Sequence, residues 1–323
     1  MRRHLAALLL AATLTATAAC GSDDGGEDAA SPGQPDKVTV GVIPILDVAP
    51  IYLGVEKGFF TDRNIDVSLE LAEGGAAIVP AVVSGQYQFG FSNVVSLLLA
   101  HSKGLPVKVV SNGNNSTGED DKDFAALMVK ADSPIKTAAD LEGKTVAANT
   151  LQNIVDTSVR ASVRKAGGDP AKVKFTALPF PEQPAALAAG RVDAVFVVEP
   201  FQQAVLAEGG RKIASSYVDA APDLTVAVYF ASQQLIGENP DLVARFTEAM
   251  QQSLSYADSN PEEARQIIGT YTEIAPEVIE KVTLPKWPPD VNRDSVQTMA
   301  DLALEDGLLT EEPDVNALLP GTE

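Results

Sequence analysis

The chain has 323 residues, of which 44 are Asp or Glu and 24 are Lys or Arg, and its formal net charge is −20. A chain this acidic repels phosphate backbones, so we expect no nucleic-acid partner. Apolar residues make up 45% of the sequence, which is enough for the core of one large domain or of two small ones.

The first residues predict export and a lipid anchor. Arg2 and Arg3 precede an apolar run over 5–19, which is too short to span a bilayer, and small residues lead to Cys20, the only cysteine. This segment resembles a bacterial lipoprotein signal, although Thr17 stands where such signals usually carry leucine. The resemblance implies that the cysteine is lipidated and that the mature protein is held at the extracytoplasmic face of the cell membrane. A signal anchor or a buried helix is the alternative.

We expect residues 1–19 to be a signal peptide and residues 20–36 to be a lipidated, flexible tether. From 21 to 36 the chain is rich in Gly, Ser, Asp, Glu, Pro and Ala and has no aromatic residue. Such a segment has little apolar surface to offset the entropy of ordering it. The folded part is therefore expected to begin at residue 37.

From residue 37 onward, short β-rich runs alternate with helical stretches, an order that predicts parallel βαβ units with right-handed crossovers. The first series predicts strands over 37–44, 65–72, 87–93 and 107–112, with helices over 49–60, 76–85 and 94–104. The second predicts strands over 144–150, 173–179 and 192–200, with helices over 153–168 and 181–190. Gly85 and Gly190 follow helix ends at equivalent places, where a left-handed cap is typical. Two similarly built lobes are expected.

Two further strands, over 124–130 and 226–232, fall outside both series. Helices are expected after them over 239–259, with Asn239 as the cap, and over 260–271 and 295–309. We predict that the chain leaves lobe one at the first of these strands and returns at the second. The predicted fold class is α/β, with two Rossmann-like lobes joined by two crossover strands. Lobe one comprises residues 37–128 and 229–323, lobe two comprises residues 129–228, and the hinge lies near 127–130 and 227–231.

The residues needed for common catalytic and metal sites are missing. His101 is the only histidine after the signal segment, so neither a Ser-His-Asp nor a Cys-His arrangement is indicated. The Gly-Lys-Thr at 143–145 lacks the upstream glycine of a phosphate loop, because Ala138 stands there. The run NGNNSTGEDDKD, residues 112–123, lacks calcium-hand spacing and is interpreted as a solvated acidic loop. We expect no enzyme activity, no metal and no cofactor.

Several stretches, in order, carry a resemblance to a known family: VTVGVIPILDVAPIYLGVEKGFF, GGAAIVPAVVSGQYQFGFSN, DLEGKTVAAN, ALAAGRVDAVFVVEPF and NPDLVARF. Over about residues 38–268 the chain resembles periplasmic substrate-binding proteins of the nitrate, sulfonate and taurine family, which also includes thiamine-pyrimidine-type binders. The resemblance implies a type II periplasmic-binding-protein fold and a ligand clamped between two lobes. It also implies a monomer that delivers its solute to the permease and ATPase of an ABC transporter. The pyrimidine synthases of the same superfamily rely on a cysteine-rich motif and a histidine that this chain lacks.

The expected ligand site lies beyond the carboxyl ends of the strands, where helix N-termini present free N–H groups. The candidate residues are Asp47, Gly75, Ala76, Asn93, Asn149, Thr150, Gln152, Asn153, Glu199, Phe201 and Tyr229. A plain turn at Gly75 and helix capping at Asn149, Thr150 and Asn153 are the alternatives, and capping is compatible with ligand contact. The aromatic candidates, and Phe180 with them, either stack on a ligand ring or pack in the core.

None of these loops contains Lys or Arg, so we expect a neutral, zwitterionic or singly anionic ligand, such as a taurine-, sulfonate-, nitrate- or pyrimidine-like solute. Asp47 and Glu199 come from opposite lobes and are expected to hold an amine or another N–H donor between them. An exported enzyme acting on a small nitrogen heterocycle, or a receptor that senses the solute without transporting it, is the alternative function. The sequence predicts no role for Trp287.

Overall fold

The computed structural model describes residues 34–321, and all elements below belong to the unit Pro35–Glu323. The signal peptide, the lipidation of Cys20 and most of the tether, as predicted from the sequence, lie outside the described residues. Within residues 34–321, no helix is long and apolar enough to cross a membrane.

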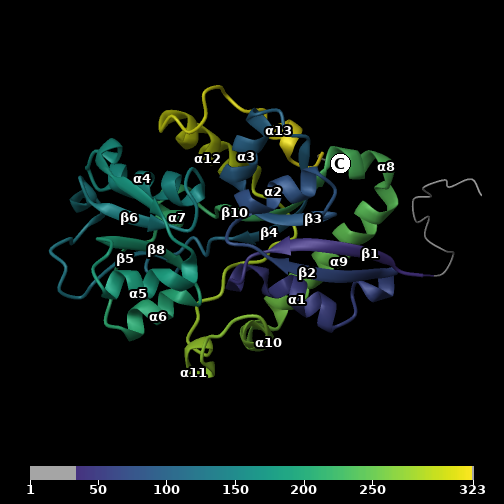
Figure 1. Cartoon of the computed structure of the whole chain (residues 1–323), viewed down its shortest axis with the longest axis horizontal. Coiled ribbons are helices and arrows are strands. Elements are labelled where there is room, and N and C mark those ends of the chain that lie inside the picture. The colour runs from purple at the N-terminus through teal and green to yellow at the C-terminus, as the bar shows by residue number, and fades with distance from the viewer. Residues whose placement is uncertain (1–33, 322–323) are drawn as a thin grey trace, which may run out of the picture. The chain divides into compact units, whose positions relative to one another are not determined.

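The first sheet combines four strands from the first half of the chain with one that returns later in the sequence (Figure 1). The order of strands in this sheet is β2-β1-β3-β10-β4. The strands are β1 Asp36–Val42, β2 Ile65–Leu71, β3 Phe89–Asn93, β4 Val107–Asn115 and β10 Thr225–Ser232. β1 pairs in parallel with β2 and β3. The crossovers are α1 Ala49–Glu56 and α2 Gly75–Val83, and α3 Val94–Ser102 leads from β3 to β4. β10 runs antiparallel to both β3 and β4.

The second sheet repeats this arrangement. The order of strands in this sheet is β7-β6-β8-β5-β9. The strands are β5 Ala125–Val129, β6 Thr145–Ala148, β7 Lys174–Ala177, β8 Ala194–Val198 and β9 Arg211–Ala214. β6 pairs in parallel with β7 and β8, and β5 runs antiparallel to β8 and β9. The helices are α4 Ile154–Lys165, α5 Gln183–Ala188, α6 Phe201–Ala207 and α7 Ser216–Ala220. The matching strand orders confirm the predicted α/β fold with two Rossmann-like lobes, named here lobe one and lobe two after their sheets.

Each antiparallel strand belongs wholly to one sheet. In β5, Leu127 pairs with Phe196 of the second sheet, and in β10, Tyr229 pairs with Phe91 of the first. Lobe boundaries at residues 128 and 229, and a hinge within 127–130 or 227–231, would therefore cut through strands that are hydrogen-bonded on both sides. The chain instead crosses between the sheets in the segments 116–124 and 221–224, which contain no strand.

Helices dominate after β10, as the sequence predicts. They are α8 Gln233–Glu238, α9 Pro240–Ser259, α10 Pro261–Gln266, α11 Pro276–Ile279, α12 Arg293–Glu305 and α13 Val315–Leu318. Short 3-10 helices are η1 Leu46–Val48, η2 Thr61–Arg63, η3 Ala138–Leu141, η4 Pro170–Lys172, η5 Phe180–Glu182 and η6 Ile267–Thr270. The side chain of Asn239 accepts a hydrogen bond from Leu242 N, and Gly85 and Gly190 adopt φ angles of 77° and 69°. These three predicted caps are confirmed.

β4 extends through a run of asparagines that the sequence placed in a solvated loop. Asn112, Asn114 and Asn115 are buried in this strand. Asn112 Nδ2 donates to Asn115 Oδ1 at 3.1 Å, and Asn114 Nδ2 donates to Asp47 Oδ1 at 3.0 Å. The loop prediction was wrong at 112–115 because these side-chain hydrogen bonds offset the cost of burying amides in a sheet.

Gly54 of α1 sets the closest approach between α1 and α9. A Cβ atom at this position would lie 2.0 Å from Ser253 Oγ and 2.8 Å from the Phe60 ring. We expect Gly54→Ala to lower the free energy of unfolding by about 1–3 kcal/mol, because it overpacks a filled interface. Gly237→Ala is the control, since a Cβ there meets nothing within 4 Å in α8. Chemical denaturation measures both, and equal stability of Gly54→Ala and the wild type would contradict this packing.

Candidate functional site

An internal cavity, which we call the inner cavity, lies where the two lobes meet. Its lining comes from both lobes: Ile43, Ile45, Asp47, Phe91, Asn93, Val226 and Ala227 from lobe one, and Asn149, Ile154, Val155, Phe180, Val198 and Tyr217 from lobe two. Its volume is about 30 Å³, room for little more than water. A larger ligand therefore requires the lobes to move apart.

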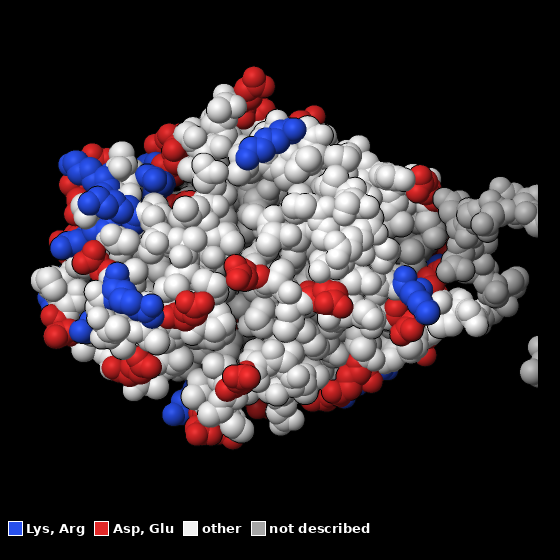
Figure 2. Space-filling view, viewed as in Figure 1, with Lys and Arg blue, Asp and Glu red and all other residues white. Residues whose placement is uncertain are grey.

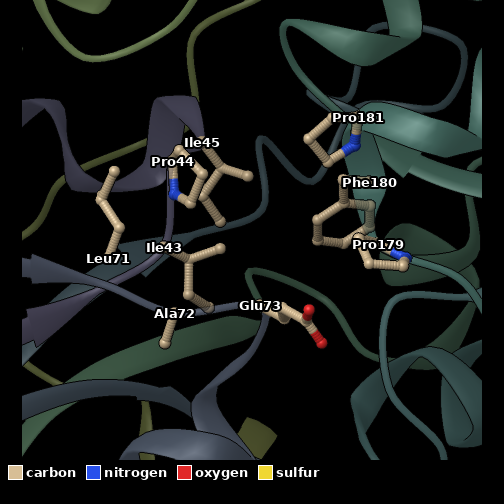
Figure 3. Close-up of a pocket in the computed structure, with 9 residues that line it drawn as sticks. All are labelled: Ile43, Pro44, Ile45, Leu71, Ala72, Glu73, Pro179, Phe180 and Pro181. Atoms are coloured by element: carbon tan, nitrogen blue, oxygen red, sulfur yellow. The ribbon is translucent and has the colours of Figure 1, made fainter.

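A second, more open cavity, the outer cavity, adjoins the inner one and shares Ile43, Ile45 and Phe180 with it. Its volume is about 240 Å³. Figure 3 shows Ile43 and Ile45 on one side and the Phe180 ring on the other, with the Glu73 carboxylate between the two groups. The inner cavity and its mouth thus combine apolar walls with a few polar groups, as small-molecule sites do.

Asp47 is the acidic residue of the inner cavity. It lies in η1, between the carboxyl end of β1 and the start of α1, and is only 2% exposed. Asn114 Nδ2 donates to its Oδ1, whereas its Oδ2 has no hydrogen-bond partner among the described residues. Burial, with a smaller contribution from the nearby Asp123, raises the pKa of Asp47 to about 7. Trp287 Nε1 donates to the backbone oxygen of Asp47 at 3.4 Å, which gives this buried tryptophan a positioning role.

The N-termini of α3 and α4 meet at the inner cavity and are capped by asparagines. Asn93 Oδ1 accepts from Ser96 N of its own helix at 2.9 Å and from Ile154 N of the opposite lobe at 3.3 Å. Asn153 Oδ1 accepts from Val155 N at 2.9 Å. Side chains of this chain thus occupy the N–H groups at the start of α4 that would otherwise attract an anion.

Asn149 links the lobes at the rim of the cavity. Its Nδ2 donates to Glu73 O across the cleft at 3.4 Å, and its Oδ1 accepts from Asn153 Nδ2 at 2.8 Å. Thr150 Oγ1 also accepts from Asn153 Nδ2, at 2.8 Å. Capping is therefore the observed role of Asn153, whereas Asn149 both supports the cap and lines the inner cavity.

Gly75, Ala76 and Gln152 do not line either cavity. Gly75 begins α2 and packs tightly on β3, since a Cβ there would lie 2.2 Å from Ser92 Oγ. Ala76 and Gln152 are exposed, and Gln152 N donates to Asp156. These three residues shape the helix openings rather than face the space between the lobes.

Glu199 departs most from the sequence prediction. Glu199 is fully buried, and its Oε1 accepts from Gln202 Nε2, Gln203 Nε2 and Thr283 N at 2.9, 2.9 and 3.1 Å. Burial raises its pKa to about 7. In this structure these intramolecular donors occupy the Glu199 carboxylate, and Glu199 does not line the inner cavity, so the structure does not bring Asp47 and Glu199 together around one N–H donor.

The aromatic candidates divide between the core and the cavity. The Phe201 and Phe180 rings have centroids 6.4 Å apart and nearly parallel planes, and Phe201 lines a further cavity of about 570 Å³ that shares Pro44, Leu71 and Pro181 with the outer cavity. Tyr229 is buried in lobe one, 5.2 Å from the Phe91 ring, and its hydroxyl has no hydrogen-bond partner among the described residues. Phe91 and Tyr217 line the inner cavity but were not among the candidates. The position of Phe91 near the carboxyl end of a predicted strand is the signal that could have identified it.

The side chains that line the inner and outer cavities are acidic or uncharged. Among the described residues, none that lines the inner or outer cavity is Lys, Arg or His. Figure 2 shows that most Lys and Arg on its face gather over the second sheet, near α4 and β6. No group of three or more His, Cys, Asp or Glu residues suited to a metal ion occurs within residues 34–321.

Burial of Asp47 has a consequence for stability. Its pKa rises from 3.8 to about 7, so between about pH 4 and pH 7 the folded protein holds a proton that the unfolded chain has lost. Stability is therefore expected to fall as pH rises through this window. Asp47→Asn should reduce the loss of unfolding free energy between about pH 5.5 and pH 8 by about 2 kcal/mol.

Chemical denaturation at several pH values measures this effect. Asp66→Asn, at an exposed aspartate of β2, is the matched control. A pH profile of Asp47→Asn that runs parallel to the wild-type profile would show that Asp47 ionises normally in the folded protein.

Sequence comparison gives a family and two named relatives. Residues 46–264 match the family described as NMT1/THI5 like. The chain is 26% identical over 225 residues to the formylaminopyrimidine-binding protein of Halalkalibacterium halodurans, covering 68% of this chain and 65% of that protein. It is 25% identical over 229 residues to the riboflavin-binding protein RibY of Chloroflexus aurantiacus, covering 69% of this chain and 62% of that protein. The match spans less than two thirds of either relative.

Solved structures share the fold at lower identity. The alkanesulfonate-binding protein SsuA from Xanthomonas axonopodis, bound to MOPS, has a TM-score of 0.74 at 18% identity, covering 90% of this chain and 100% of that chain. A ligand-binding component of an ABC-type import system from Staphylococcus aureus has a TM-score of 0.73 at 15% identity, with coverages of 88% and 97%. The periplasmic nitrate-binding protein NrtA from Synechocystis has a TM-score of 0.73 at 16% identity, with coverages of 88% and 84%.

Proposed function

The chain belongs to the NMT1/THI5-like family, and we propose that it is the solute-binding protein of an ATP-driven importer. It has the fold of periplasmic binding proteins, and the relatives and structural neighbours named above bind small solutes. In this proposal the protein works outside the cytoplasm as a monomer, with a permease and its ATPase as partners and no catalytic step. Lipidation of Cys20 would hold it at the membrane through the tether.

The proposed ligand is a small, flat nitrogen heterocycle of the pyrimidine type. One observation carries this choice: the inner cavity offers the unpartnered Asp47 carboxyl oxygen beside the aromatic residues Phe91 and Phe180, with no cation in its lining. A sulfonate or nitrate in this cavity would find no Lys, Arg or His among the described residues of the lining, and Asn153 already occupies Val155 N at the start of α4. A neutral ring finds apolar faces and polar groups at its edge.

Capture requires the lobes to open and close, because the inner cavity is small in this structure. We place the hinge in the crossing segments, where Ser116 N donates to Leu224 O at 2.8 Å. Opening would break the hydrogen bonds that cross the cleft: the long ones from Ile154 N to Asn93 and from Asn149 to Glu73 O, and a shorter one from Leu46 N to Glu199 O at 3.1 Å. In this proposal a bound ligand adds contacts to those that already join the lobes in the closed form.

Phe180 provides the test of this site. After retained solute is removed by unfolding and refolding, the full-length protein in detergent is titrated with 2-aminopyrimidine and related aminopyrimidines, taurine, ethanesulfonate and nitrate. We expect an aminopyrimidine to raise the unfolding temperature, and Phe180→Ala to weaken its binding by about tenfold or more because the aromatic wall is lost. Phe59→Ala, which removes a partly buried ring that contacts Tyr256 in lobe one, is the matched control.

The proposed ligand class and the proposed binding site are contradicted by different results. A shift with taurine, ethanesulfonate or nitrate, and none with the aminopyrimidines, would contradict the ligand class while keeping the binding function. Equal weakening by Phe180→Ala and Phe59→Ala would show that the cavity between the lobes is not where the ligand binds.

A further inference from the structure

Asp47 lines the inner cavity, and one of its two carboxyl oxygens has no hydrogen-bond partner among the described residues. Asn114 Nδ2 donates to its Oδ1 at 3.0 Å and so orients the carboxyl group, while Trp287 Nε1 donates to its backbone oxygen and so holds the main chain there. Its Oδ2 is buried and has no partner among the described residues. A buried polar atom of this kind costs free energy unless a ligand group pairs with it.

The surroundings of Asp47 contain no compensating positive charge. The titratable groups that interact with it are Asp123 before β5, Tyr217 of α7, Tyr229 of β10 and Tyr271 after η6. Burial raises the pKa of each tyrosine well above 10, so these hydroxyls stay neutral. Asp123 has the same sign as Asp47 when ionised, and its own pKa is raised by burial. Each of these titratable neighbours therefore favours the protonated form of Asp47 or is indifferent to its charge. The hydrogen bonds from its own backbone N–H and from Asn114 favour the ionised form, but burial outweighs them.

We infer that Asp47 binds the ligand as a neutral carboxylic acid, with Oδ2–H donating a hydrogen bond to an acceptor atom of the ligand. This inference rests on the proposed function and narrows its ligand class: the ligand presents an unprotonated ring nitrogen or a carbonyl oxygen to Asp47, not an ammonium group. Asn114 orients the acid by donating to Oδ1, which leaves Oδ2 to carry the proton. The raised pKa of about 7 makes this form available near neutral pH.

Two variants of Asp47, to asparagine and to alanine, distinguish a neutral acid that donates to the ligand from an ionised carboxylate that contacts it. Asp47→Asn keeps an oxygen that accepts from Asn114 and places an N–H donor where Oδ2–H lies, whereas Asp47→Ala removes both groups. 2-Aminopyrimidine is a suitable probe, because its ring stays neutral from weakly acidic to basic pH. The dissociation constant for the full-length protein is measured by calorimetry from about pH 5.5 to pH 8.5.

For the wild type, we expect the dissociation constant to rise up to about tenfold for each pH unit above the Asp47 pKa. Asp47→Asn should bind at all pH values within about twofold of the wild type at low pH, and Asp47→Ala should bind at least about tenfold more weakly. If Asp47→Asn binds as weakly as Asp47→Ala, or if wild-type affinity increases with pH, the ligand contacts an ionised carboxylate and the inference is wrong.

Proton exchange tests the same point on the wild-type protein alone, and so does not depend on the folding of any variant. Calorimetry near pH 8 in buffers of different ionisation enthalpy should show proton uptake on binding, because the ligand selects the protonated acid. Proton release, or no exchange, would overturn the inference while leaving the proposed function intact. Failure of 2-aminopyrimidine to bind at low pH would overturn both the inference and the proposed ligand class.

Discussion

The hydrogen bond from Asn114 to Asp47 ties together the parts of the molecule that make the site. It joins the last turn before α1 to the end of β4, and β4 is the strand from which the chain crosses to lobe two. The neighbouring Asn115 pairs through its backbone with Lys286, and Asn112 donates to Pro288 O, so the C-terminal segment closes over the same strand. The side-chain nitrogens of these buried asparagines all donate hydrogen bonds, and Asp47 Oδ2 is left without a partner among the described residues.

The same fold can recognise different solutes according to what occupies the helix N-termini. Two of the structural neighbours named above are an alkanesulfonate-binding and a nitrate-binding protein, and both ligands are anions. In this chain Asn93 and Asn153 occupy N–H groups at the start of α4, and a carboxyl group lies in the inner cavity. In our proposal, a few side chains on a shared arrangement of sheets make this site suit a neutral ring.

The sequence was sufficient to predict the order of strands and helices, because apolar runs and capping residues are local signals. Asn239, Gly85 and Gly190 are examples whose caps follow from the residue and its immediate neighbours. Asp47, Asn93 and Asn149 also line the inner cavity, since the carboxyl ends of parallel strands gather at one edge. The length of β4 could not be predicted in this way, because asparagine usually favours turns and its hydrogen bonds here are made to distant residues.

Glu199 shows the other limit of sequence reasoning. It follows a strand and precedes a helix, as a ligand residue would, but Thr283 N, which lies 84 positions away, donates to its carboxylate. Local pattern cannot reveal such a contact. Likewise, the crossing segments become visible only when the pairing of β5 and β10 assigns each strand to one sheet.

The most direct test of the account is a crystal structure of the protein with 2-aminopyrimidine. The account predicts the ring in the space between Phe91 and Phe180, with a ring nitrogen within hydrogen-bonding distance of Asp47 Oδ2 and the cleft closed around it. A ring bound elsewhere, or bound in the cavity with Asp47 turned away and its Oδ2 paired within the protein, would contradict it.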